Sequence, residues 1–276
     1  MADNTSISTE EFDYIRKVLR EHSAIVLDEG KAYLAEARLG PLVRQEGLET
    51  LSELVRTLQK APWGRLHTKV VEALATNETS FFRDSGPFES LKKVVIPNLV
   101  EARSASRTIR IWSAACATGQ EPYSVAMLLR EHFLALDSWN VEIIATDLSN
   151  DVLERAREGR YSQLEINRGL PAPMLVKYFV KDGTGWKIKD EIRTMVEFRQ
   201  LNLVENWPAM QEMDVVLLRN VLIYFDLETR KLIYERLHRV IKPDGYLLLG
   251  GGETPSNIDE RFKRVQCEKC DFYQLA

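Results

Sequence analysis

The first part of the chain has the hydrophobic spacing of amphipathic helices and contains no convincing strand. In Glu11–His22, apolar residues recur every three or four positions, as expected for one buried helical face. The same spacing returns in Lys31–Leu39 and in Leu48–Gln59. Because proline disfavours helical geometry at the preceding residue, we expect Gly40-Pro41 to break or kink the second of these helices.

From about Thr108 the pattern changes to short apolar runs that alternate with amphipathic segments. Four runs predict strands, and a fifth strand, "YLLLGG", is expected after a "KPDG" turn; the four runs are Ile109–Ala115, Val141–Asp147, Met195–Asn202 and Met213–Asn220. The alternation of strands with helices indicates an α/β fold with a parallel sheet covered on both faces.

The helices of this region carry recognisable start signals. "GQEPYSVAMLLREHF" predicts the helix after the first strand, and "SNDVLERAREG" predicts a helix capped by Ser149 or Asn150. Asp226 is the expected N-cap of "DLETRKLIYERLHRVI". Helical spacing in that segment places four apolar residues on one face: Leu232, Ile233, Leu237 and Ile241.

Two stretches depart from the alternation. "KYFVKDGTGWKIKDEI" predicts two strands around a glycine-containing turn, so we expect a small antiparallel insertion at about residues 162–193. "RFKRVQ" and "DFYQLA" predict a C-terminal hairpin. We therefore divide the chain into a helical N-terminal domain (1–76), a linker and pocket segment (77–107) and an α/β domain (108–276).

Composition narrows the class of protein. The 276 residues carry a net charge of −4, which argues against general nucleic-acid binding. The polar N-terminus does not resemble a secretory signal, and the apolar run around Arg219 is too short to cross a membrane. The pair Cys267 and Cys270 has metal-ligand spacing, but no second pair exists, so no metal site is expected. We expect a cytoplasmic protein without membrane insertion.

Polar residues follow several of the predicted strands, where ligands of open α/β sheets bind. Asp147 ends the second strand, Asn202 the third and Arg219-Asn220 the fourth. A carboxylate at the position of Asp147 suits a ribose, because it can accept hydrogen bonds from two adjacent hydroxyls. Each residue alone could equally be an ordinary cap or turn. Gly119 follows the first strand, but the dinucleotide and P-loop glycine motifs are absent.

The stretch "NETSFFRD", Asn77 to Asp84, combines hydrogen-bonding side chains with two adjacent phenylalanines. A surface loop does not need Phe81 and Phe82, and a core helix does not need Asn77 or Arg83. This mixture indicates the wall of a pocket, in which the aromatic rings serve packing.

Five motifs together resemble the chemotaxis receptor glutamate O-methyltransferases, the CheR family: "NETSFFRD", "CATGQEPYSVAM", "ATDLS", "LRNVLIYFD" and "KPDGYLLLGGGE". The resemblance covers nearly the whole chain in order. It implies a Rossmann-like methyltransferase sheet and methyl transfer from S-adenosylmethionine to a chemoreceptor glutamate, which yields a methyl ester and S-adenosylhomocysteine. Two departures are Gly251-Gly252, where the family often has a His-Ser pair, and Gly40-Pro41.

The resemblance also implies a set of cofactor contacts. Asp147 should hold the ribose hydroxyls, Asn202 and Leu203 should border the adenine, and Glu121 should lie toward the methionine end with Arg219-Asn220. The full set by similarity is Asn77, Thr79, Arg83, Glu121, Asp147, Asn202, Leu203, Arg219 and Asn220.

The chemistry of the implied reaction needs no general base. A free glutamate has a pKa of about 4.3, so the acceptor is ionised at neutral pH. The four histidines lie outside every motif, in agreement with this. The reaction requires alignment of a carboxylate with the sulfonium methyl and exclusion of water. Arg83 is the candidate for orienting the carboxylate, with Tyr224 as a neutral donor beside it.

Two features of the sequence concern recognition of the receptor. Arg38 and Arg44 could form a basic patch that steers an acidic receptor helix, or an ordinary solvated helix face. The turn "KDGTG" of the insertion is short, so we expect no dependence on a receptor tail peptide. Two alternative hypotheses for the function are a non-catalytic scaffold that binds S-adenosylmethionine and a methyltransferase that acts on another protein or a small molecule.

Overall fold

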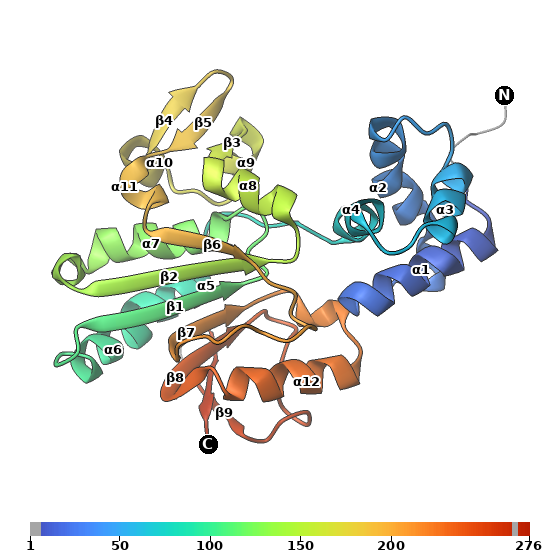
Figure 1. Ribbon diagram of the computed structural model, residues 1–276. Helices are drawn as coiled ribbons and strands as arrows, with labels where there is room; N and C mark the ends of the chain where they lie inside the picture. The colour runs from blue at the N-terminus through green and yellow to red at the C-terminus, as the bar shows by residue number, and fades with distance from the viewer. Residues whose placement is uncertain (1–6, 267–269) are drawn as a thin grey trace. The chain divides into compact units, whose positions relative to one another are not determined.

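The computed structural model describes residues 7–266 and 270–276, which form two compact units (Figure 1). The first unit comprises the described residues up to Thr76 together with Tyr224–Thr229. The second comprises Asn77–Ile223 and Arg230–Ala276. Within the described residues, no helix is both long enough and apolar enough to cross a membrane. Cys267, on which the metal spacing depends, lies outside the described residues.

The first unit is helical, as the spacing of apolar residues predicts. Its elements are α1 (Thr9–Ser23), η1 (Glu29–Lys31), α2 (Ala32–Gln45), α3 (Leu51–Lys60) and α4 (Arg65–Leu74). Ser8 begins α1 with a capping box, and Thr50 caps α3 by accepting from the Glu53 N–H at 3.1 Å. The three predicted helices are confirmed, whereas the sequence pattern did not predict α4 as a separate helix.

The expected break at Gly40-Pro41 is wrong, because α2 continues through Pro41 to Gln45. Proline removes one backbone hydrogen bond from a helix interior. The helix persists because its buried face continues on both sides of the proline, with Leu39 before it and Leu42 and Val43 after it. Tertiary packing of an amphipathic face outweighs local propensity here.

The second unit is built on a seven-stranded sheet in the order β6-β2-β1-β7-β8-β10-β9. Its parallel part is confirmed and consists of β1 (Thr108–Ala114), β2 (Asn140–Asp147), β6 (Val196–Gln200), β7 (Met213–Leu218) and β8 (Ile241–Leu249). The predicted C-terminal hairpin, β9 (Phe262–Val265) and β10 (Phe272–Leu275), adds antiparallel strands next to β8.

Helices cover both faces of this sheet, as expected for an α/β fold (Figure 1). Alternate residues of β1 point to opposite faces, so Ile111 belongs to the main core while Trp112 packs against Trp207 on the other face. The first face is covered by α5 (Ser85–Ser90), η2 (Leu91–Val95), α6 (Ile96–Ala102), α7 (Gln120–His132) and α8 (Asn150–Glu158). Helix α12 (Leu227–His238) lies on the opposite side from α7.

One expectation at α12 is confirmed, and two need correction. The Asp226 cap is confirmed, since its carboxylate accepts from the Thr229 N–H at 3.0 Å. Leu232, however, is 39% exposed, and Ile241 is already the first residue of β8 rather than part of the helix. The buried face of α12 is therefore narrower than predicted and includes Ile233 and Leu237.

The "KPDG" segment is not a turn before the fifth strand but an irregular part of β8. Met213 of β7 pairs with Ile241, whereas Val215 pairs with Tyr246, so the register shifts between these pairs. The shift brings Lys242 to the buried Asp214, where its ammonium donates at 2.8 Å. An ion pair between residues distant in the chain thus stabilises a strand at a segment whose sequence predicts a turn.

The antiparallel insertion is confirmed as a second sheet in the order β3-β5-β4. Its strands are β3 (Arg160–Tyr161), β4 (Phe179–Asp182) and β5 (Gly185–Ile188). Three short helices accompany them: α9 (Gln163–Asn167), α10 (Ala172–Tyr178) and α11 (Asp190–Arg193). The 3₁₀ helix η3 (Leu134–Ser138) lies outside this insertion and follows α7.

Candidate active site

The loop after β1 is held in an unusual backbone conformation at the carboxyl edge of the sheet. Ala115 and Ala117 have φ values of 55° and 48°, which are uncommon for residues other than glycine. Cys116 between them is buried, and its N–H donates to the Thr146 carbonyl at 2.9 Å. The loop is therefore tied to the end of β2, and Cys116 serves as a small apolar residue, as expected.

Asp147 at the end of β2 is buried, with 7% of its surface exposed. One carboxylate oxygen accepts from the Ala117 N–H at 2.8 Å and the other from the Ser149 N–H at 3.1 Å. Burial raises the pKa of Asp147, although these backbone hydrogen bonds oppose the shift. Each oxygen keeps a further lone pair, so the carboxylate can still accept hydrogen bonds from adjacent hydroxyls.

Gly119, the single glycine of this loop, is required by packing. It has a φ of 90°, and a Cβ there would lie 3.0 Å from the Ala156 Cβ and 3.3 Å from the rings of Phe198 and Tyr123. The glycine therefore lets the start of α7 pack closely against α8 and β6.

Arg219, directly after β7, connects three segments of the site. Its Nη1 donates to the Glu121 carboxylate at 2.8 Å, and its Nη2 donates to the Arg83 carbonyl at 2.8 Å and to Asp84 at 3.1 Å. Glu121 also accepts from the Ser113 hydroxyl at 2.8 Å. The buried Nε of Arg219 has no hydrogen-bond partner among the described residues. The cluster thus retains an unused donor.

The loop that follows Arg219 is organised by Glu253, which sequence reasoning missed. The buried Glu253 carboxylate accepts from the N–H groups of Asn220, Val221 and Leu222 at 2.7, 2.8 and 2.7 Å. It also accepts from the Gly250 N–H at 2.7 Å. The only sequence signal was an acid after a glycine run, and no spacing rule connects that acid to residues about thirty positions earlier.

Asn220 and Gly250 approach one another closely in this arrangement. Asn220 has a φ of 59°, a conformation that asparagine tolerates better than most residues. A Cβ on Gly250 would lie 2.8 Å from the Asn220 backbone nitrogen, so a side chain there would collide with it. Gly251 and Gly252, which depart from the family pattern, are exposed, and among the described residues no atom lies within 4 Å of an added Cβ.

The segment "NETSFFRD" forms one side of the site through its aromatic residues. The Phe81 ring is fully buried and packs against Tyr161 and Phe179 at 4.9 and 5.6 Å between centroids. The Phe82 N–H donates to the Ser124 hydroxyl at 3.0 Å. Arg83 donates from Nη1 to the Glu78 carbonyl at 3.0 Å. The expected packing role of the phenylalanines is confirmed.

Two polar side chains of this segment keep their hydrogen-bonding capacity. Asn77 and Thr79 are half-buried, and neither makes a hydrogen bond within the part of the chain that the structure describes. A half-buried amide and hydroxyl without protein partners are available to a ligand.

The remaining candidates lie after β6 and after β7. The Leu201 N–H donates to the Asp147 carbonyl at 2.9 Å, so Asn202 and Leu203 follow directly on a contact with the end of β2. The Asn202 side-chain oxygen accepts from the Val204 N–H at 3.2 Å, and Leu203 is buried. Tyr224 belongs to the segment that groups with the helical unit, where its carbonyl accepts from the Val26 N–H at 2.9 Å.

Hydrogen bonds therefore bring most sequence-predicted residues of the sheet unit into two neighbouring groups. One group joins Arg83, Glu121 and Arg219, with Asn220 adjacent in the chain. The other joins Asp147 to the loop after β1 and to the start of the Asn202 segment. Because β2, β1 and β7 are consecutive in the sheet, both groups lie at its carboxyl edge. The first group contributes the charged pair of Arg219 and Glu121, and the second contributes a carboxylate that can accept hydrogen bonds from hydroxyls. Together they suit a ligand in which a nucleoside is linked to an amino acid.

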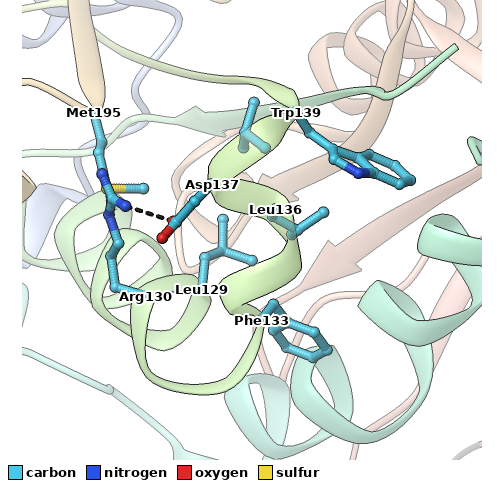
Figure 2. A pocket seen from close by; sticks show the side chains of 8 residues that line it. Leu129, Arg130, Phe133, Leu136, Asp137, Trp139 and Met195 are labelled. Carbon is cyan, nitrogen blue, oxygen red and sulfur yellow. Dashed lines mark hydrogen bonds and ion pairs between the residues drawn. The ribbon is translucent and has the colours of Figure 1, made fainter.

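Another pocket lies near the amino end of β2, at the opposite end of that strand from Asp147. Figure 2 shows its lining by Leu129, Phe133, Leu136 and Trp139, with an ion pair between Arg130 and Asp137. This pocket is small and mostly apolar, and no sequence-predicted residue lines it.

Two family models match the chain and together cover most of it. The description "CheR methyltransferase, all-alpha domain" matches residues 10–75, and "CheR methyltransferase, SAM binding domain" matches residues 77–270. The residues that form both groups of the site fall within the second match.

Curated relatives are similar over nearly their whole length. The chain is 41% identical to "Chemotaxis protein methyltransferase Cher2" of Pseudomonas putida, over 96% of this chain and 97% of the relative. It is 42% identical to "Chemotaxis protein methyltransferase 1" of Pseudomonas aeruginosa, over 98% and 99% of the two chains. It is 37% identical to the "Chemotaxis protein methyltransferase" of Vibrio parahaemolyticus, over 98% of each. The chain therefore belongs to the CheR family of methyltransferases, whose cofactor is S-adenosylmethionine.

Proposed function

We propose that the protein transfers the methyl group of S-adenosylmethionine to glutamate side chains of bacterial chemoreceptors and forms glutamate methyl esters. One observation carries this proposal: Arg219 joins the backbone carbonyl of Arg83, on the segment expected to face the acceptor, to the Glu121 carboxylate, on the segment expected to face the cofactor. The names of the curated relatives support chemoreceptors as the substrate class. The reaction takes place in the cytoplasm, on the cytoplasmic helical region of the receptor.

The residues of the carboxyl edge fit S-adenosylmethionine. Asp147 accepts hydrogen bonds from the ribose hydroxyls, which its two oxygens can do while keeping their backbone partners. Asn202 and Leu203 border the adenine. Glu121, Arg219 and Asn220 hold the methionine end, where the unused Arg219 Nε offers one more donor. Asn77 and Thr79 supply the remaining hydrogen bonds.

The bound cofactor supplies an electrophilic methyl group, and the chain positions the acceptor. The glutamate is ionised at neutral pH, so no residue needs to remove a proton before attack. Arg83 orients the acceptor carboxylate, and Tyr224 offers a neutral hydroxyl. Phe81 is buried beside this segment and Phe82 is partly buried, and both help to exclude water from a weak nucleophile.

Transfer of isotope from labelled S-adenosylmethionine to receptor-containing membranes tests the function. Base-labile label on the receptor is the expected result, because methyl esters hydrolyse in base. Cofactor binding without any turnover would instead identify a non-catalytic scaffold. Label that appears only on another protein or small molecule would replace the substrate class.

Recognition of the receptor rests on the helical unit, and here the two basic candidates differ. Arg44 is exposed and free to contribute to a salt-sensitive association rate. Arg38 donates to the Leu74 carbonyl at 2.5 Å and to the Thr76 hydroxyl at 3.1 Å, so it is partly committed to the end of α4. Arg44→Glu should therefore slow receptor methylation more at low salt than at high salt.

A receptor tail peptide is not required by this proposal. Only Gly183 and Thr184 separate β4 from β5, so the insertion offers a short hairpin with β4 at its edge. Titration of the C-terminal pentapeptide of a cognate receptor should give no binding, and a tailless receptor should still be methylated. Micromolar binding at the insertion would contradict this expectation.

A further inference from the structure

The connection after α9 contacts the same segment that carries Arg83. The Arg168 guanidinium donates to the Glu78 carboxylate, and the Glu78 carbonyl accepts from the Arg83 Nη1 at 3.0 Å. Glu78 is thus held from two sides, by its carboxylate toward the β insertion and by its carbonyl toward Arg83. A residue of the insertion is therefore linked to Arg83 through one intervening residue.

Gly169, the next residue, makes a closer approach to this segment. It has a φ of 99°, and a Cβ built there would lie 2.1 Å from the Phe81 carbonyl oxygen. No real Cβ contact is that short, so a side chain would force one of the two backbones to move. The two segments approach as they do only because residue 169 is glycine.

Aromatic packing joins the same two regions from the inside. Phe81 packs edge-on against Tyr161 of β3 and Phe179 of β4, and all three side chains are buried. The Tyr161 hydroxyl donates to the Thr118 carbonyl at 2.8 Å, in the loop after β1. A close-packed core transmits displacement rather than absorbing it, so movement of Phe81 displaces its neighbours in the chain.

We propose that Arg168 and Gly169 of the β insertion are positioning residues for the reaction: they fix the backbone at Glu78 and Phe81 and thereby the places of Thr79 and Arg83. The part that concerns Arg83 rests on the proposed function, whereas the part that concerns Thr79 rests only on cofactor binding. Both side chains of the Arg168–Glu78 pair are more than half exposed. Such a pair adds little to folding stability, so its main consequence is where Glu78 lies.

Two variants test this inference, Gly169→Ala and Arg168→Gln. We expect Gly169→Ala to weaken S-adenosylhomocysteine binding about tenfold by calorimetry, because displacement of the Phe81 backbone misplaces Thr79, and one lost hydrogen bond costs up to about tenfold in affinity. Arg168→Gln should lower the rate of receptor methylation by a factor of about three to ten, with a smaller change in receptor KM. The thermal midpoint of Arg168→Gln should stay near that of the wild type.

Matched controls lie in the same insertion. Gly183→Ala also places alanine at a positive φ, 58°, but no atom of the described residues lies within 4 Å of its Cβ, so it tests a left-handed alanine without the collision. Arg160→Gln breaks the Arg160–Asp182 pair, which does not touch the segment. Both controls should bind and methylate as the wild type does. The exchange of charges, Glu78→Arg with Arg168→Glu, should restore much of what Arg168→Gln loses.

The outcomes separate this inference from the proposed function. Equal losses in Gly169→Ala and Gly183→Ala, or wild-type binding and turnover in both test variants, would overturn the positioning role. A wild-type protein that never labels receptors would refute the proposed function. In that case the calorimetric comparison of Gly169→Ala with Gly183→Ala still decides whether the insertion positions the segment.

Discussion

Two buried arginine–carboxylate clusters lie at opposite ends of β7, and they differ in how completely they are paired. At the amino end, Arg103 donates from Nε to Asp214 at 2.7 Å and from both terminal nitrogens to Asp244. At the carboxyl end, Arg219 uses both terminal nitrogens, but its buried Nε has no partner among the described residues.

The buried carboxylates at the two ends of the sheet, Asp214 and Asp147, also differ in how completely they are paired. Asp214 is fully buried and accepts from Arg103, from the Lys242 ammonium and from the Arg110 N–H at 2.7 Å. Asp147, which is also buried, accepts from backbone N–H groups, and no ion-pair partner reaches it within the part of the chain that the structure describes. A saturated cluster fastens secondary structure, whereas a cluster with unused capacity is available to a ligand. Burial of charge alone therefore does not mark a functional site.

The largest expected effect concerns the saturated cluster. Asp214→Ala leaves Lys242 and the Arg110 N–H without their buried acceptor, which should lower the free energy of unfolding by about 3–5 kcal/mol. Urea denaturation measures this loss. Asp137→Ala, which removes a half-exposed ion-pair partner of Arg130, is the control and should cost less than about 1 kcal/mol. If Asp214→Ala instead weakened cofactor binding without changing stability, the comparison would fail.

The next effect concerns Asp147. Asp147→Asn should weaken S-adenosylhomocysteine binding by about 1.5–3 kcal/mol, the range for hydrogen bonds to a charged group. The fold should remain intact, because the amide oxygen still accepts one backbone N–H. Calorimetry together with circular dichroism makes this measurement. Unchanged affinity would remove Asp147 from the cofactor site.

Arg83 allows cofactor binding and chemistry to be separated. Arg83→Lys should reduce the turnover number about tenfold or more, because an ammonium cannot reproduce the paired hydrogen bonds of a guanidinium. Cofactor affinity should change less, and Arg199→Lys, whose partner is the exposed Glu197, should change neither. Equal losses of affinity and turnover would mean that Arg83 serves mainly the cofactor.

The smallest effect is a pH dependence of stability. Because burial raises the pKa of Asp147, its protonated form favours the ligand-free folded state. This contribution is fully present below the ordinary value of 3.8 and is lost as pH rises through the folded pKa. As pH rises just above 3.8, the free energy of unfolding of the wild type should therefore fall relative to that of Asp147→Asn. A pH-independent difference would show that burial does not perturb this carboxyl.

Several features of the molecule follow from the sequence because they depend on neighbours in the chain. The helices of the first unit, the strand–helix alternation and the caps at Ser149 and Asp226 all arise from local spacing and local hydrogen bonds. Asp147 and Arg219-Asn220 could be placed at one edge because parallel strands end at the same side of a sheet. The family resemblance supplied the remaining candidates.

Other features depend on residues that are distant in the chain, and for these the tertiary structure decides. Pro41 stays inside α2 because residues on both sides of it are buried, and α2 packs against α3 and α4. The "KPDG" segment joins β8 because Lys242 and Asp244 meet Asp214 and Arg103. Glu253 shapes the loop after Arg219, and Gly169 lies against Phe81. Local spacing cannot specify such partners, because the free energy of burial and of buried charge pairing depends on which distant groups the folded chain brings together.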